Sequence, residues 1–108
     1  MNELELMQGT LDLLVLKALI WGPMHGYAVA RWIAVTTDEN LQIEEGALYT
    51  ALHRMEKRRW LACEWGLSEN NRKAKYYQLT AAGRRELRSK SAAFLRYAGA
   101  VFKVLETA

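Results

Sequence analysis

The N-terminal half of the chain alternates between apolar stretches of helical length and short polar or glycine-containing breaks. Residues 11–20 are apolar except for Asp12 and Lys17, which predicts a helix that the rest of the protein largely covers. Thr10 offers a side-chain oxygen as its N-cap, and Gly22-Pro23 ends the helix because proline cannot continue it. Two further helices are predicted at residues 25–36 and 44–59.

The third predicted helix has two contrasting faces. Leu48, Leu52 and Met55 recur at i, i+4 and i+7, so this face is expected to pack in a core. The opposite face is small, hydroxylic and basic, whereas a solvated helix usually shows a mixture of glutamate and lysine. Its members are Gly46, Thr50, His53 and Lys57, with Tyr49 and Arg54 at the two flanks.

Beyond residue 60 the hydrophobic period changes from that of a helix to that of a strand. Residues 61–65 and 72–80 predict two strands, joined by a polar turn at 66–71. The fold class is therefore mainly α with a small β-hairpin, in the order of a winged helix-turn-helix. Basic side chains gather at the tip and on the return arm of the hairpin, namely Arg72, Lys73 and Lys75.

The last predicted helix, residues 81–107 with Thr80 as N-cap, is longer than a domain of this size needs as cover, since about 27 residues span about 40 Å. Its apolar positions form a heptad-like seam that we expect to pack on a second copy, the alternative being a helix folded back on its own core. The seam comprises Leu87, Phe94, Leu95, Ala98, Val101, Phe102 and Leu105. Residues 1–80 would form the winged-helix domain and 81–108 the dimerisation helix of the same compact unit.

Charge is distributed unevenly along the chain. Its 108 residues, 51% hydrophobic and 25% charged, suffice for one globular domain and argue against wholesale disorder. Residues 1–52 carry a net charge of −5 and residues 53–108 a net charge of +8, which together give the +3 of the chain. A basic half indicates a polyanionic partner, and a merely solvated, charge-rich surface is the alternative.

Several functional classes find no support in the sequence. No apolar run is long enough to span a membrane. An acidic start (Asn2, Glu3 and Glu5) unlike a secretory signal, and a single cysteine, Cys63, predict a cytoplasmic protein. Cys63 and His53 lack a third residue to orient the histidine, and metal-ligand spacings are missing. We therefore expect no enzyme, no metal and no other cofactor.

Some aromatic residues have local interpretations. His25 is expected to hydrogen-bond the backbone at the start of the second helix, in preference to a phosphate. The ring of Tyr49 is expected to pack while its hydroxyl reaches outward to DNA. Trp32, Trp60 and Trp65 are interpreted as packing residues rather than as platforms for a ligand.

Four motifs resemble the PadR-like family of transcriptional regulators. They are QGTLDLLVLKAL (8–19), GPMHGYAVA (22–30), GALYTALHRME (46–56) and WGLSENNRKAKYYQLTAAGRREL (65–87). Together they cover nearly the whole chain in the order and spacing of the family, and the segment SENNRKAKYY is most similar to its short, acidobacterial-type branch. The resemblance implies a winged-helix DNA-binding domain followed by a C-terminal dimerisation helix.

The resemblance also implies a function and a set of contacts. Such proteins act mostly as repressors that bind an inverted-repeat operator in double-stranded DNA as homodimers. Some respond to small hydrophobic or phenolic effectors near the dimer interface, so such an effector is a candidate partner here. The recognition-helix positions of the family fall on Gly46, Ala47, Tyr49, Thr50, His53 and Arg54. The wing positions that contact the DNA backbone fall on Asn70, Asn71, Arg72, Lys73 and Lys75.

Three positions depart from the family pattern and leave the operator sequence open. Ala47, Thr50 and Arg59 stand where the family commonly has serine or threonine, proline, and glycine. Arg59 replaces a residue suited to a positive φ at a helix end, which implies a strain of about 1 kcal/mol. From the residues themselves a rival function also stays open, in which the winged helix binds an acidic protein in place of DNA.

Overall fold

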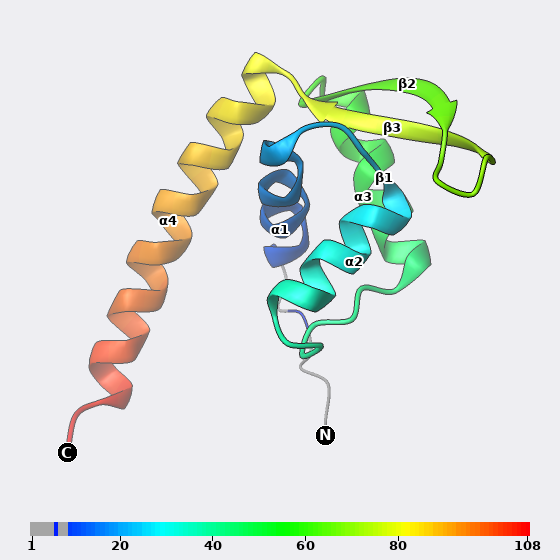
Figure 1. Cartoon of the computed structure of the whole chain (residues 1–108). Helices are drawn as coiled ribbons and strands as arrows, with labels where there is room; N and C mark the ends of the chain where they lie inside the picture. The colour runs from blue at the N-terminus through cyan, green and yellow to red at the C-terminus, as the bar shows by residue number, and fades with distance from the viewer. Residues whose placement is uncertain (1–5, 7–8) are drawn as a thin grey trace.

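Three short helices, a small sheet and one long helix follow one another in the order of a winged helix (Figure 1). The computed structural model describes Leu6 and residues 9–108, so the acidic start and Gln8 of the first motif lie outside the described residues. The elements are α1 (Thr10–Ala18), η1 (Leu19–Trp21), β1 (Met24–His25), α2 (Gly26–Thr36), α3 (Glu45–Lys57), β2 (Leu61–Leu67), β3 (Lys73–Leu79) and α4 (Ala81–Leu105). This order confirms the predicted fold class.

The first helix begins and ends differently from the prediction. Its N-cap is Gly9, with a φ of 90°, so Thr10 is already the first helical residue and the assignment of Thr10 as the cap was wrong by one position. After Ala18 the chain tightens into the 3-10 turn of η1, where we had predicted α-helix as far as residue 20. None of the described helices is both long and apolar enough to cross a membrane.

The second helix is capped by His25, which hydrogen-bonds the backbone as predicted. Its Nδ1 atom accepts a hydrogen bond from the backbone amide of Ala28 at 3.2 Å, which satisfies one of the free donors of the first helical turn. The same residue also belongs to β1, since Met24 and His25 pair antiparallel with β3. The sequence pattern missed this strand because two residues are too few to show a period.

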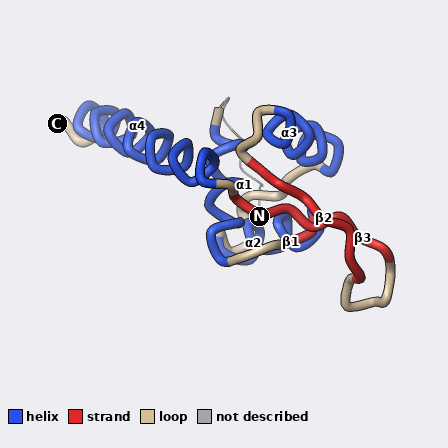
Figure 2. The backbone as a smooth tube through the Cα atoms, turned by 90° about the horizontal axis from the view of Figure 1, so that it is seen from above, coloured by secondary structure: helices blue, strands red, loops and turns tan. Residues whose placement is uncertain are grey.

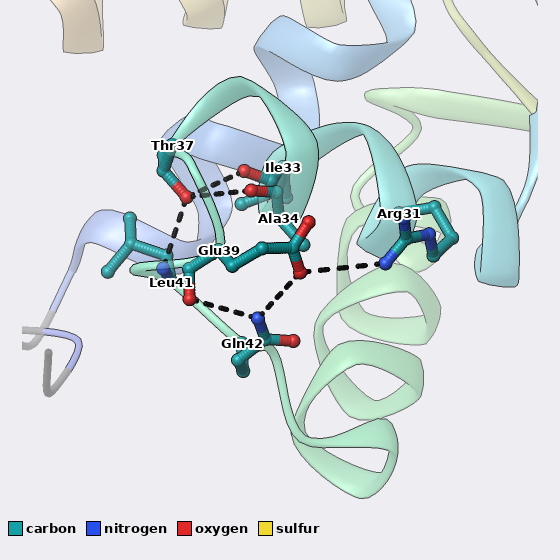
Figure 3. Close-up of polar contacts among 7 residues, drawn as sticks. All are labelled: Arg31, Ile33, Ala34, Thr37, Glu39, Leu41 and Gln42. Atoms are coloured by element: carbon teal, nitrogen blue, oxygen red, sulfur yellow. Dashed lines mark hydrogen bonds and ion pairs between the residues drawn. The ribbon is translucent and has the colours of Figure 1, made fainter. Parts of the chain in front are cut away.

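The turn between α2 and α3 is held together by its own polar groups (Figure 3). The Thr37 hydroxyl donates to the carbonyl oxygen of Ile33 at 2.9 Å and accepts from the amide of Leu41 at 3.1 Å. The side-chain amide of Gln42 donates to the carbonyl and carboxylate oxygens of Glu39, both at 3.0 Å. These bonds fix the path of the chain between the two helices and so set the position of α3.

The core lies between the three N-terminal helices and the sheet. Leu48, Leu52 and Met55 are 0–2% exposed, which confirms the predicted core face of α3. The strand order is β1-β3-β2, and β2 and β3 pair antiparallel along their whole length. Their hairpin, the wing, leaves the helical body on the side opposite to α4 (Figure 2).

The long helix is attached at its first turns. The Thr80 hydroxyl accepts from the amide of Gly83 at 3.0 Å, which confirms it as the N-cap, and donates to the Arg59 carbonyl oxygen at 2.7 Å. Leu87 is buried in the core of its own chain because the beginning of α4 lies against α1. The expectation that Leu87 belongs to a dimer seam is therefore wrong. Beyond it the helix runs away from the body (Figure 1).

Gly83 allows the first turn of α4 to approach the backbone at Trp60. A Cβ atom at position 83 would lie 2.1 Å from the Trp60 carbonyl oxygen, well inside any permitted contact. Gly83→Ala is therefore expected to lower the free energy of unfolding by about 1–3 kcal/mol, because backbone has to move. Gly99→Ala on the same helix meets no atom within 4 Å and is expected to raise it by about 0.5–1 kcal/mol.

Urea unfolding followed by circular dichroism measures both variants. An equal effect of the two substitutions would contradict the close approach of α4 to Trp60.

Candidate nucleic-acid interface

The third helix presents the predicted recognition positions to solvent. Leu48 and Leu52 hold it in the core, so the residues on its other side are left uncovered. Five of the six predicted positions are exposed, and Arg54 is intermediate. The exposed ones are Gly46, Ala47, Tyr49, Thr50 and His53.

Tyr49 lies across the start of α2. A Cβ atom at Gly26 would lie 2.5 Å from the Tyr49 hydroxyl oxygen, so the phenol end occupies space that a side chain at position 26 would need. The hydroxyl therefore rests against α2 rather than reaching outward as expected. Tyr49 as a whole is 43% exposed.

Arg54 is paired with an acid from another helix. Its Nη2 atom bonds the Oδ1 atom of Asp12, in the first turn of α1. The Arg54 side chain is 41% exposed and that of Asp12 is 15% exposed. From the sequence, Arg54 is expected to contact DNA with the other recognition-helix positions. The pairing with Asp12 has no signal in the sequence, because the two residues are far apart in the chain.

The tip of the wing is a tight turn with exposed cations. The Ser68 amide donates to the Arg72 carbonyl oxygen at 2.8 Å, and Asn71 adopts a positive φ of 59°, which asparagine tolerates better than most residues. Arg72 and Lys73 are exposed, as are Asn70 and Asn71. These four predicted wing positions are thus accessible to a phosphate backbone.

The fifth wing position, Lys75, is held by a carboxylate of α3. Its Nζ atom lies 3.0 Å from Oε1 of Glu56, and the Cys63 thiol donates to Oε2 of the same carboxylate at 2.9 Å. The hydrogen bonds from Cys63 and Lys75 lower the pKa of Glu56, and the bond to Glu56 raises the pKa of Lys75. Lys75 therefore ties the wing to α3, in contrast to its expected contact with a phosphate.

A hollow of about 700 Å³ separates the wing from the helices. It is lined from α2 by Tyr27, from α3 by Tyr49, and from the wing by Trp65 and Lys73. Trp65 is 61% exposed, with the Lys73 ammonium 5.1 Å from its ring centre, so the interpretation of Trp65 as a packing residue is wrong. The hairpin extends past the helices at this point. The strand periodicity of the sequence does not show where the helices stop covering the hairpin.

Known proteins resemble this chain in both sequence and fold. The family model of the transcriptional regulator PadR-like family matches residues 15–89. The chain belongs to this family. PadR-like proteins are transcriptional regulators rather than enzymes, which confirms that expectation for this chain.

Solved structures of related regulators have the same fold. A transcriptional regulator from Clostridium thermocellum is 29% identical, with a TM-score of 0.81 over 89% of this chain and 90% of its own. A PadR family transcriptional regulator from Eggerthella lenta DSM 2243 is 37% identical, with a TM-score of 0.77 over 94% and 86%. An uncharacterized protein from Lysinibacillus sphaericus is 29% identical over 80 residues, which are 74% of this chain and 73% of that protein.

One departure of this PadR-like chain from its family pattern has a visible structural effect. Arg59 has a φ of 63°, in the left-handed region where the family's glycine would be unstrained. The conformation lets the Arg59 carbonyl accept the Thr80 hydroxyl at the end of α3. Arg59 therefore adopts a positive φ at the position where the family pattern has glycine.

The bond between Cys63 and Glu56 is expected to slow thiol chemistry. That hydrogen bond, together with burial, raises the pKa of the Cys63 thiol, so less of the reactive thiolate is present near pH 8. Glu56→Ala removes the acceptor and leaves Lys75 beside the sulfur, which lowers the thiol pKa. As long as the thiol pKa stays above the pH, the rate with Ellman's reagent should rise by about three- to fourfold for each unit by which the pKa falls, because the larger thiolate fraction is partly offset by a weaker nucleophile.

Glu64→Ala is the matched control, because Glu64 is the next residue of the same strand and side chains alternate between faces. Its rate should equal that of the unmodified protein. Equal rates for Glu56→Ala and the unmodified protein would contradict the assigned bond.

Proposed function

We propose that this PadR-like protein is a repressor that binds an inverted-repeat operator in double-stranded DNA as a homodimer. The observation that carries the proposal is the exposed face of α3, with Thr50 and His53 at its centre, on the same chain as a wing whose Arg72 and Lys73 are exposed. A helix of this size fits a major groove about 12 Å wide, and wing cations suit phosphates.

The first turns of α3 supply the base contacts in this proposal. Gly46 and Ala47 are small and exposed, so they let the backbone come close to the floor of the groove. Thr50 and His53 can donate to or accept from base edges, and Tyr49 flanks them. The wing residues Asn70, Asn71, Arg72 and Lys73 would bind the DNA backbone and add affinity without sequence preference.

The far half of α4 supports assembly of two copies. Leu95, Phe102 and Leu105 are 59–72% exposed, on the part of α4 that extends beyond the core of the chain. Apolar side chains gathered in this way on one helix are stabilised by burial against a partner. We assign to the dimer seam Phe94, Leu95, Ala98, Val101, Phe102 and Leu105.

The attachment of α4 offers a route by which a small hydrophobic or phenolic effector would release the DNA. The support for such an effector is the family resemblance. Thr80 at the start of α4 is bonded to the backbone at Arg59 and Trp60, directly after α3. An effector that docks beside α4 and shifts it would therefore move the end of the recognition helix.

Fluorescence anisotropy with labelled DNA tests the proposed function. Duplex DNA from just upstream of the gene for this protein, and random duplex of equal length, are titrated at two salt concentrations, with light scattering for the oligomeric state. We expect a dimer that prefers the upstream DNA and loses affinity steeply with salt. A folded dimer that binds neither DNA would favour the acidic-protein partner, and equal binding to both would contradict an operator at that place.

Two lysines of the same strand should differ in their contribution to DNA binding. Lys73 is exposed, so Lys73→Ala should weaken binding to all sequences alike and reduce the log–log salt slope by about 1.8, the value for one phosphate contact in each copy of the homodimer. The charge of Lys75 is already paired with Glu56, so Lys75→Ala should leave the slope nearly unchanged. Equal losses of slope in the two variants would contradict the paired state of Lys75.

A further inference from the structure

We infer that Asp12 determines DNA specificity by holding Arg54 away from the operator, so that Arg54 positions the recognition helix and does not read bases. This inference rests on the proposed DNA-binding function. It concerns the ion pair between the first turn of α1 and the third turn of α3. Neither the family pattern nor the sequence pattern indicated that this arginine has a partner within the chain.

The geometry makes Arg54 a bridge between helices. Asp12 is 15% exposed, and a carboxylate this far from water requires a charged or hydrogen-bonding partner. Arg54 supplies it from α3, and the two helices pack directly against each other. The pair therefore resists rotation of α3 about its own axis, which would carry the side chain of Thr50 away from a base edge.

The position of Arg54 around the helix agrees with this role. Thr50, His53 and Lys57 follow one another at i, i+3 and i+7 along the exposed face. Arg54 stands about 100° around the helix from His53, and its guanidinium is directed to α1. To reach a base, the guanidinium would have to leave a half-covered ion pair.

Pairing also removes a source of binding without sequence preference. An unpaired arginine beside a DNA groove adds affinity for any phosphate, and such contacts strengthen binding to random DNA as much as to the operator. With its charge neutralised by Asp12, Arg54 adds little to that background. Discrimination then falls on Thr50 and His53, on the exposed face of α3.

Asp12→Asn tests the inference by releasing Arg54 with little change in shape. Binding to random duplex DNA should tighten by about three- to tenfold at low salt, with a log–log salt slope steeper by about 1.8, one additional phosphate for each copy of the homodimer. Binding to the operator should gain less, because α3 loses the restraint that sets Thr50 against a base edge, so the ratio of operator to random affinity should fall. Asp38→Asn is the matched control, because Asp38 is exposed in the turn before α3 and its φ of 53° suits asparagine.

Arg54→Ala provides a second, independent measurement, made on a panel of operators with one base pair changed at a time. We expect weaker binding to every member of the panel and an unchanged order of preference. Loss of preference at a single base pair would overturn the inference, because it would show that Arg54 reads that base. An Asp12→Asn variant that matches Asp38→Asn in both affinity and slope would overturn it as well.

The same titrations separate this inference from the proposed function. If the unmodified protein binds no duplex DNA, the proposed function fails and the inference with it. If the unmodified protein discriminates its operator while the two Asp12 and Arg54 measurements go against expectation, the function stands and the inference alone is wrong.

Discussion

The contact between the first turn of α4 and the backbone at Trp60 is the constraint on which the rest of the structure depends. Thr80 caps α4, and its hydroxyl also lies within hydrogen-bonding distance of the backbone carbonyl oxygens of Arg59 and Trp60, directly after α3. Gly83 lets the two backbones meet. The sheet, the recognition helix and the long helix are thereby joined at one point, with the wing and α4 leaving it in opposite directions (Figure 2).

Internal ion pairs divide the cations of this protein into two groups. Asp12 neutralises Arg54, and Glu56 neutralises Lys75, so two of the cations nearest to the recognition helix serve the fold. Arg72 and Lys73 at the wing stay exposed. A count of basic residues therefore overstates the charge that the molecule can offer to a polyanion, by one cation on the recognition helix and one on the wing in each chain.

Features that depend on neighbours in the sequence were predictable, whereas features that depend on distant pairs were not. The core face of α3, the caps at His25 and Thr80 and the positive φ at Arg59 follow from local periodicity, capping chemistry and family pattern. The pairing of Arg54 with Asp12, which joins α3 to α1, has no local signal. The burial of Leu87 likewise depends on where α4 docks, which a heptad pattern does not specify.

The Tyr49 ring resting on Gly26 ties together two positions that are distant in the sequence. A side chain at position 26 displaces the tyrosine from α2, and a smaller residue at position 49 leaves a gap over the glycine. Gly26 of the GPMHGYAVA motif is thus explained by its contact with Tyr49, which lies outside that motif. A change at either position alone therefore disturbs the packing of α2 against α3.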